Sequence, residues 1–272
     1  MLEHASVYTM GRGASVLGLQ FDPTGLCGHG ASGGLGPDVL EHLESVRARG
    51  AALDGECADG GRFSLHRCDR GGQVTWHGPD QLVAYPVLDL ARPGGAFAKD
   101  LHRYVEGLED AVIATLGRFG LETSRLPGYP GVWTSGGRKI AALGASASRW
   151  VTVHGLAINV SCDLRAFDRI VPCGIEGRGV TSMAEEMGAE ACPSLPEVED
   201  ALLASFAEVF GVELASARQM RGAAGAAAAA GLDPTLNAEK AAIASDAVAG
   251  GRFDVFRAGT SRSGDLREQR RA

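Results

Sequence analysis

The sequence predicts an α/β (α+β) domain in which helices pack on a sheet, and three observations support this fold class. Residues 150–160 alternate in a way typical of a β-strand, whose side chains point to opposite faces in turn. Residues 102–119 and 196–214 repeat apolar side chains at three- and four-residue spacing, as amphipathic helices do. A length of 272 residues with 45% hydrophobic content suits one such domain with additional segments.

The first strand is expected at residues 7–10, where it ends at a glycine turn. Residues 16–69 are poorly patterned and rich in glycine, apart from a possible helix at 38–49. A structureless loop of this length is unusual inside a compact domain. We therefore interpret residues 16–69 as a loop insertion that is partly disordered.

The next ordered part is a pair of strands at residues 73–77 and 82–88, joined by a turn at 78–80. Gly71 and Gly72 precede the first of these strands and would let a ligand approach the backbone closely. Arg70, directly before them, could pair with a carboxylate or a phosphate. The alternative is a glycine hairpin that carries a surface arginine.

After the helix at 102–119 and a turn-rich connection at 125–130, two antiparallel strands are expected within residues 139–160. Strand alternation would place Lys139, Ala141 and Leu143 on one face of the first strand. For His154, on the second strand, a core role and a functional role both remain open. Beyond it, a helical turn is expected at 163–170, a loop at Cys173, and a helix at 183–187 capped by Thr181 or Ser182.

Composition argues against several classes of function. The net charge of −7 gives no basic signature for nucleic acid binding. No apolar run reaches the ~18 residues that a membrane span requires. The six cysteines include no Cys-x-x-Cys pair, which argues against a structural zinc site, and reduced thiols are the simplest interpretation. We expect no metal and no cofactor, and we expect a low-complexity, disordered tail at residues 215–272.

Cys173 and Lys139 are the candidate reactive groups. Lys139 is one of three lysines in the chain, and an amine can serve as the base for a thiol that the fold brings close to it. A nearby cation lowers the pKa of a thiol from about 8.5, whereas an apolar site makes a lysine lose its proton more easily. Ion-pair and neutral-pair states of the two groups both remain open.

Four segments, taken in this order, resemble the lipoyl(octanoyl) transferase family. They are residues 70–79 (RGGQVTWHGP), 139–141 (KIA), 154–159 (HGLAIN) and 172–175 (PCGI). Residues 2–13 also resemble the early strand of that family. The resemblance covers roughly residues 1–15 and 69–212, and it favours a catalytic domain at 1–214.

The resemblance implies the fold of the biotin and lipoate protein ligases, a mixed, mostly antiparallel sheet flanked by helices. It also implies an acyltransferase that moves an octanoyl group from acyl carrier protein to a lysine of a lipoyl domain. By match, Cys173 is the nucleophile and Lys139 the proton shuttle. The residues that match acyl-binding segments are Arg70, Gly71, Gly72, Gln73, Val74, Thr75, Trp76, His77, Ala142, Leu143, Gly144, His154, Gly155, Leu156 and Ala157. Backbone amides near Gly71, Gly72 or Gly155 would stabilise the oxyanion.

The resemblance also sets expectations for partners. The acceptors would be the lipoyl domains of 2-oxoacid dehydrogenase complexes and the glycine cleavage H protein, and the enzyme would be a monomer. Relative to the family pattern, we expect the chain to lack a strand and a helix before residue 2, and Asp80 stands at a position usual for glycine. The long insertion and the tail favour a mitochondrial or plastid matrix location over the cytoplasm.

Two alternatives of other classes remain. An ATP-dependent lipoate or biotin protein ligase activates a carboxylate as an adenylate and needs no cysteine nucleophile, so Cys173 argues against it. A non-catalytic lipoyl-domain binding protein would not need Cys173, Lys139 and His77.

Overall fold

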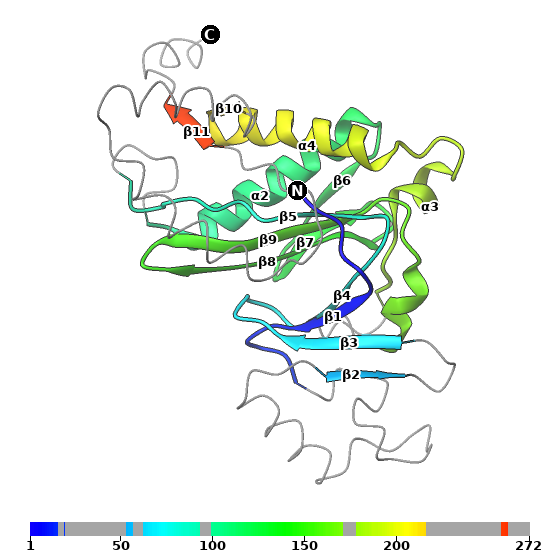
Figure 1. Ribbon diagram of the computed structural model, residues 1–272. Helices are drawn as coiled ribbons and strands as arrows, with labels where there is room; N and C mark the ends of the chain where they lie inside the picture. Colours follow the sequence, from blue (N-terminus) through cyan, green and yellow to red (C-terminus); the bar gives the residue numbers. More distant parts are fainter. Residues whose placement is uncertain are drawn as a thin grey trace, which may run out of the picture.

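The computed structural model describes residues 1–15, 19, 53–56, 62–92, 99–170, 178–215 and 257–260. Its centre is a five-stranded antiparallel sheet (Figure 1). In spatial order the strands are β5 (Gln81–Ala84), β9 (Val151–Asn159), β8 (Lys139–Ser148), β7 (Tyr129–Thr134) and β6 (Thr123–Leu126).

A second sheet has four strands, in the order β2 (Leu53–Glu56), β3 (Arg62–Arg67), β1 (Val7–Met10) and β4 (Val74–His77). Strands β1 and β3 are parallel, and the other two pairs are antiparallel. Two short strands, β10 (Val212–Ala215) and β11 (Arg257–Thr260), form a separate antiparallel pair. The predicted α+β class with mostly antiparallel sheets is therefore confirmed.

Two long helices, α2 (Leu101–Arg118) and α4 (Leu195–Phe210), cover one face of the five-stranded sheet, and the four-stranded sheet lies on the other side (Figure 1). Asp100 caps α2 by accepting a hydrogen bond from the Arg103 N–H. The helices and the sheet share an apolar core, which includes Leu82, Tyr104, Leu108, Val112, Leu116, Val132, Ile140, Ala141, Leu156, Ile158, Val198, Leu202 and Phe210. This core holds the five-stranded sheet against the helices, and the opposite face of the sheet is turned toward the four-stranded sheet.

A smaller apolar core lies under the four-stranded sheet. The rings of Trp76 and Phe167 meet edge to face at 5.5 Å, and the Tyr8 hydroxyl donates a hydrogen bond to the Ala166 carbonyl. Phe167 belongs to the 3₁₀ helix η2 (Leu164–Arg169). This cluster fixes β4, and with it the loop that precedes β4, against the rest of the molecule.

Most of the predicted elements are confirmed. The structure contains the strand at residues 7–10, the hairpin within 139–160, the helix near 102–119 and the helical turn near 163–170. Helix α3 (Met183–Met187) begins as expected, because the Ser182 hydroxyl accepts a hydrogen bond from the Glu185 N–H. The helix expected at 38–49 lies outside the described residues.

Residues 16–69, interpreted above as a loop insertion, contain the strands β2 and β3 of the four-stranded sheet. Three boundaries also differ from the prediction. Strand β5 ends at Ala84 because Pro86, two residues later, has no N–H to donate to a sheet. Helix α4 ends at Phe210 because Gly211 takes a left-handed conformation, after which the chain continues as β10. Residues 125–130 are not a plain connection: they hold the turn of the β6–β7 hairpin, where Gly128 has a φ of +82°.

Candidate active site

The hairpin of β8 and β9 brings two of the predicted segments together. Residues 142–144 lie directly opposite residues 155–157, and the cross-strand pairs are Ala142–Ala157, Leu143–Leu156 and Gly144–Gly155. Leu143 and Leu156 pack toward the helices. The alanine and glycine pairs therefore form a band of small residues on the other face of the sheet.

A β-bulge at Ile140 decides which way Lys139 points. Val132 of β7 pairs with Ala141, while Trp133 pairs with Lys139, so Ile140 is one extra residue in β8. Ile140 and Ala141 both join the helix-covered core, whereas Lys139 lies beside Trp133 on the opposite face. The prediction that Lys139, Ala141 and Leu143 share a face is wrong, because the bulge interrupts the alternation.

Lys139 is only 5% exposed. Its Nζ lies 5.1 Å from the centre of the Trp133 ring, and Gly131 packs against its side chain. The Lys139 N–H donates to the Gly179 carbonyl at 3.0 Å, and its carbonyl accepts from the Thr181 N–H at 2.9 Å. Gly179 and Thr181, which follow Cys173 in the sequence, therefore lie directly beside Lys139.

Cys173 lies outside the described residues, as do Cys27 and Cys57. The three described cysteines are Cys68, Cys162 and Cys192, and all are free thiols. Burial raises the pKa of each of them, and that of Cys162 rises to about 12. A raised pKa disfavours the thiolate, so none of these three thiols is activated as a nucleophile.

Arg70 holds the glycine loop in place. Its guanidinium donates to the carbonyl and the hydroxyl of Thr9 and to the Gly71 carbonyl, at distances of 2.6 to 3.2 Å. Because Arg70 is buried, it is not the surface arginine of the second interpretation. These contacts support a structural role that joins β1 to the loop. Pairing of Arg70 with a substrate anion stays a prediction.

The glycine loop crosses the small-residue band of β8. The Gly71 N–H donates to the Ala145 carbonyl at 3.1 Å, so it is already engaged and does not face a substrate carbonyl. The Gly72 N–H has no partner among the described residues, and Gly72 has a φ of +85°. Of the two amides in this loop that were predicted as oxyanion donors, Gly72 is the better candidate.

The remaining predicted residues of this segment divide by burial. Val74 and Trp76 are core residues under the four-stranded sheet, whereas Gln73 is exposed and Thr75 half-buried. Gly155 is needed for packing, since a Cβ there would lie 2.3 Å from the Ala84 carbonyl oxygen. Substrate contacts of these residues stay predictions.

His77 is buried, and its Nδ1 lies 2.7 Å from the Oε1 of Gln81. Burial lowers the pKa of His77 to about 4, so the imidazole is neutral at physiological pH. The His4 ring lies 5.5 Å from the His77 ring, and the Tyr85 hydroxyl is 2.9 Å from the His4 Nε2. His154 meets the edge of Tyr85 from β9, at a φ of +63°. The structure thus gathers His77 and His154, both predicted, with His4 and Tyr85, which were not.

The lowered pKa of His77 predicts a loss of stability in acid. Below pH 6.5 the unfolded chain protonates this histidine, while the folded chain stays neutral until the pH approaches 4, so stability falls as the pH falls through this window. The loss amounts to about 3 kcal/mol. We expect urea titrations of the wild type and of His77→Asn to diverge between pH 6.5 and 4. Parallel pH profiles for the two proteins would contradict this prediction.

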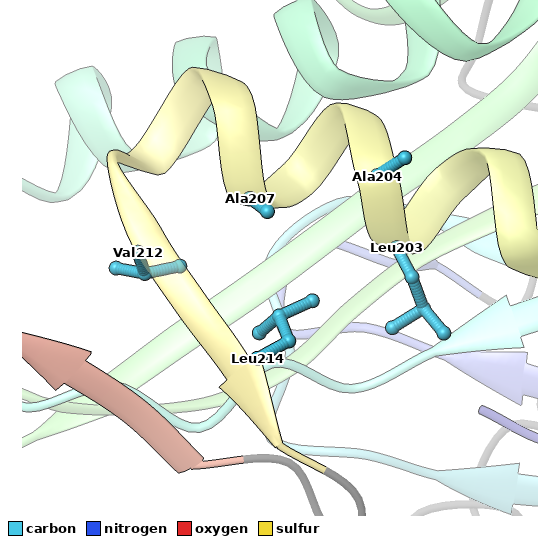
Figure 2. Close-up of a pocket in the computed structure, with 5 residues that line it drawn as sticks. All are labelled: Leu203, Ala204, Ala207, Val212 and Leu214. Carbon is cyan, nitrogen blue, oxygen red and sulfur yellow. The ribbon is translucent and has the colours of Figure 1, made fainter.

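An apolar hollow lies away from the residues discussed so far. It lies between α4 and β10, has a volume of about 520 Å³ and is lined by aliphatic side chains (Figure 2), namely Leu203, Ala204, Ala207, Val212 and Leu214. None of the predicted site residues lines it, and it holds no titratable group. We therefore place no chemistry there.

Two further features bear on the class of function. Within the described ranges, no three His, Cys, Asp or Glu side chains are arranged to hold a metal ion. None of the described helices has the length and apolar character needed to cross a membrane.

The comparisons with known proteins agree with the geometry. Residues 52–207 match the lipoyl protein ligase A/B catalytic domain. The octanoyltransferase of Nostoc punctiforme is 40% identical over 214 residues, which are 79% of this chain and 74% of that protein. The octanoyltransferase of Chloroflexus aurantiacus is 44% identical over 204 residues, 74% of this chain and 82% of its own.

One further relative and one solved structure complete the comparison. The octanoyltransferase of Gloeobacter violaceus is 46% identical over 183 residues, 65% of this chain and 78% of its own. A bipartite lipoate protein ligase from Thermoplasma acidophilum covers 78% of this chain and 70% of its own, with a TM-score of 0.49 and 16% identity. The sequence matches are the stronger of these likenesses.

Proposed function

The chain belongs to the lipoyl protein ligase A/B catalytic domain family, and we propose on that basis that it is an octanoyltransferase of protein lipoylation. The observation that carries the proposal beyond family membership is the setting of Lys139. Its side chain is buried on the face of the sheet opposite the helices, and its backbone pairs with Gly179 and Thr181, which follow Cys173 in the sequence.

The first half-reaction would load the enzyme. The Cys173 thiolate attacks the carbonyl carbon of an octanoyl thioester on acyl carrier protein, and the bond to the carrier's sulfur breaks. Lys139 takes the proton of the Cys173 thiol and gives it to the departing carrier thiolate. One thioester replaces another, so no ATP is consumed.

The second half-reaction would modify the acceptor. A lysine amine of a lipoyl domain attacks the Cys173 thioester, an amide bond forms, and the Cys173 sulfur leaves. Lys139 accepts the proton that the attacking nitrogen loses and returns it to the thiolate. An N–H such as that of Gly72 would stabilise the oxyanion in both steps, a contribution of roughly 3 kcal/mol per donor.

The band of small residues suits the acyl chain. Ala142 and Gly144 alternate with Leu143 on β8, and their partners on β9 are Ala157 and Gly155. Backbone of the glycine loop packs on Gly144 and backbone of the Ala84 segment packs on Gly155, whereas Ala142 and Ala157 present only methyl groups. We expect the octanoyl chain to contact the band at Ala142 and Ala157.

The donor, the acceptors and the location are also proposals. Octanoyl-acyl carrier protein is the donor that fits an ATP-free thioester exchange, and lipoyl domains of 2-oxoacid dehydrogenases and the glycine cleavage H protein are the expected acceptors. We further expect a monomer. The mitochondrial or plastid location stays a prediction.

The proposal can be tested with the wild-type protein and mass spectrometry. We expect octanoyl-acyl carrier protein alone, without ATP, to leave an octanoyl adduct on the Cys173 peptide, and a lipoyl domain to remove it. A parallel sample receives free octanoate, ATP and Mg²⁺. Modification that requires ATP would indicate a ligase instead. Lipoyl-domain binding without any transfer by a folded protein would indicate a binding protein.

A further inference from the structure

A chain of buried side-chain amides connects His77 to the backbone of Lys139. The His77 Nδ1 lies 2.7 Å from the Gln81 Oε1, and the Gln81 Nε2 lies 2.8 Å from the Asn159 Oδ1. The Asn159 Nδ2 in turn lies 2.9 Å from the Thr181 carbonyl, and the Thr181 N–H donates to the Lys139 carbonyl. Gln81 and Asn159 are 1% and 4% exposed.

Backbone carbonyls, which can only accept hydrogen bonds, fix the direction of every hydrogen bond in this series of side chains. The Thr181 carbonyl can only accept, so the atom of Asn159 that faces it must be the NH₂ group, and the Asn159 oxygen must face Gln81. Gln81 therefore presents its NH₂ group to Asn159. The same NH₂ group lies 3.3 Å from the Trp76 carbonyl, which also can only accept, so a second anchor fixes the same orientation.

With Gln81 oriented in this way, only one tautomer of the neutral His77 ring can form the hydrogen bond. The Gln81 oxygen faces Nδ1 and can only accept, so Nδ1 carries the hydrogen. In a neutral imidazole the other nitrogen, Nε2, then has a lone pair and no hydrogen. Among the described residues nothing donates a hydrogen bond to Nε2, and His77 is more than nine-tenths buried.

The sheet register explains why these residues can act together. Gln81 on β5 and Asn159 on β9 are direct cross-strand partners, and His77 is the last residue of β4. Asn159 follows Ile158, which faces the helices, so the Asn159 side chain lies on the same face as Lys139. The chain thus joins both sheets at the point where the proposed site lies.

We propose that Gln81 and Asn159 are positioning residues of the acyl-transfer site, which hold His77 as the Nδ1–H tautomer with Nε2 as a hydrogen-bond acceptor. The consequence for the reaction rests on the proposed function. An imidazole lone pair serves an N–H donor, and the proposed reaction supplies such donors in Lys139 and the acceptor amine. The Asn159–Thr181 bond also fixes the backbone of Lys139 relative to His77.

The structural half of the proposal is tested by NMR of the free protein, whatever the protein catalyses. Long-range ¹H–¹⁵N spectra distinguish a protonated ring nitrogen from a bare one. We expect the His77 Nε2 to be bare in the wild type and Gln81→Leu to give a mixture of tautomers. Asn159→Ala should change the tautomer less, because the Trp76 carbonyl still orients Gln81. A protonated Nε2 in the wild type, or an unchanged tautomer in Gln81→Leu, would overturn the proposal.

The catalytic half is tested by steady-state kinetics of octanoyl transfer. We expect Gln81→Leu and Asn159→Ala to lower kcat by at least about tenfold while the KM for the donor stays within about twofold. The matched control is Thr152→Val, because Thr152 is another buried polar residue of β9, whose hydroxyl bonds Pro86 and Leu88 far from this chain. If Thr152→Val loses as much kcat as the other two variants, the loss results from lower stability and not from the position of His77, and the proposal is overturned.

A second substitution at Gln81 covers the case in which the leucine variant does not fold. Gln81→Glu keeps the shape and keeps an oxygen facing Nδ1, but its second oxygen meets the acceptors of Asn159 and Trp76. We expect this variant to stabilise the doubly protonated imidazolium of His77 and to lower kcat at neutral pH. A Gln81→Glu protein with a wild-type His77 spectrum and wild-type kcat would contradict the proposed role of the hydrogen-bonded series from His77 to Thr181. If the wild type shows the bare Nε2 but transfers no octanoyl group, the proposed function fails and the tautomer assignment stands.

Discussion

Replacing Lys139 by methionine is expected to lower octanoyl transfer at least about 10³-fold, the size of a general acid–base contribution. Methionine keeps the length and most of the apolar contacts of the side chain but has no basic atom. Since Lys139 is buried against Trp133 and Gly131, the variant should fold as the wild type does. The loss should appear in single-turnover measurements of both thioester formation and transfer to the lipoyl domain.

Lys99→Met is the matched control for this change. Lys99 is the other lysine among the described residues. It is exposed, and its N–H bonds the Leu90 carbonyl near the turn of the hairpin, at the opposite end of β8 from Lys139. Its replacement makes the same chemical change at a different place and should leave the rate within about twofold of the wild type. If Lys139→Met transfers octanoyl groups within about tenfold of the wild-type rate, Lys139 is not the proton shuttle and another base must be sought.

Replacing Gly131 by alanine is expected to be the next most damaging change, although Gly131 has no reactive group. A Cβ at this position would lie 2.3 Å from the Lys139 Cε and 2.9 Å from the Ala141 carbonyl oxygen. The side chain of Lys139 must then move by an ångström or more, and misplacement of this size can cost about 10² in rate. We expect a loss of that order in transfer, measured at saturating donor.

An alanine at position 131 would both strain the backbone and displace Lys139, and these two effects must be separated. Gly128→Ala is the control for backbone strain alone. Gly131 has a φ of +133° and Gly128, in the turn before it, has a φ of +82°, so alanine is strained at both positions. A Cβ at Gly128 meets nothing within 4 Å. Gly128→Ala should therefore lose about 1 kcal/mol of stability but keep its activity. Equal activity losses in the two variants would show that strain, not displacement of Lys139, is responsible.

The sequence predicted those parts of the site that depend on local pattern. Alternation and glycine placement are enough to locate the hairpin of β8 and β9, and the register then brings residues 142–144 opposite 155–157 without further assumptions. The helices α2 and α4 follow from apolar spacing in the same way. These features depend on neighbours within a few residues, which is the range that a sequence pattern reports.

Contacts between distant segments could not be predicted in this way. Arg70 bonds to Thr9, 61 residues earlier, and the side chain of Gln81 reaches Asn159, 78 residues later. The sequence pattern does not predict that these polar residues are buried. They are buried because the two sheets pack against each other. The strand β7 was missed for a different reason, because the prolines and glycines of residues 127–131 resemble a loop.

The bulge at Ile140 separates a packing position from a site position within two consecutive residues of β8. Ile140 fills the helix-covered core, and a valine or a leucine there changes the volume of that core by little. Loss of Ile140 would remove the bulge and make Lys139 the direct neighbour of Ala141, so strict alternation would still point the lysine away from the helices. In descendants of this gene, an in-frame deletion of codon 140 would therefore spare the direction of Lys139, and its cost would be the loss of a fully buried isoleucine from the core.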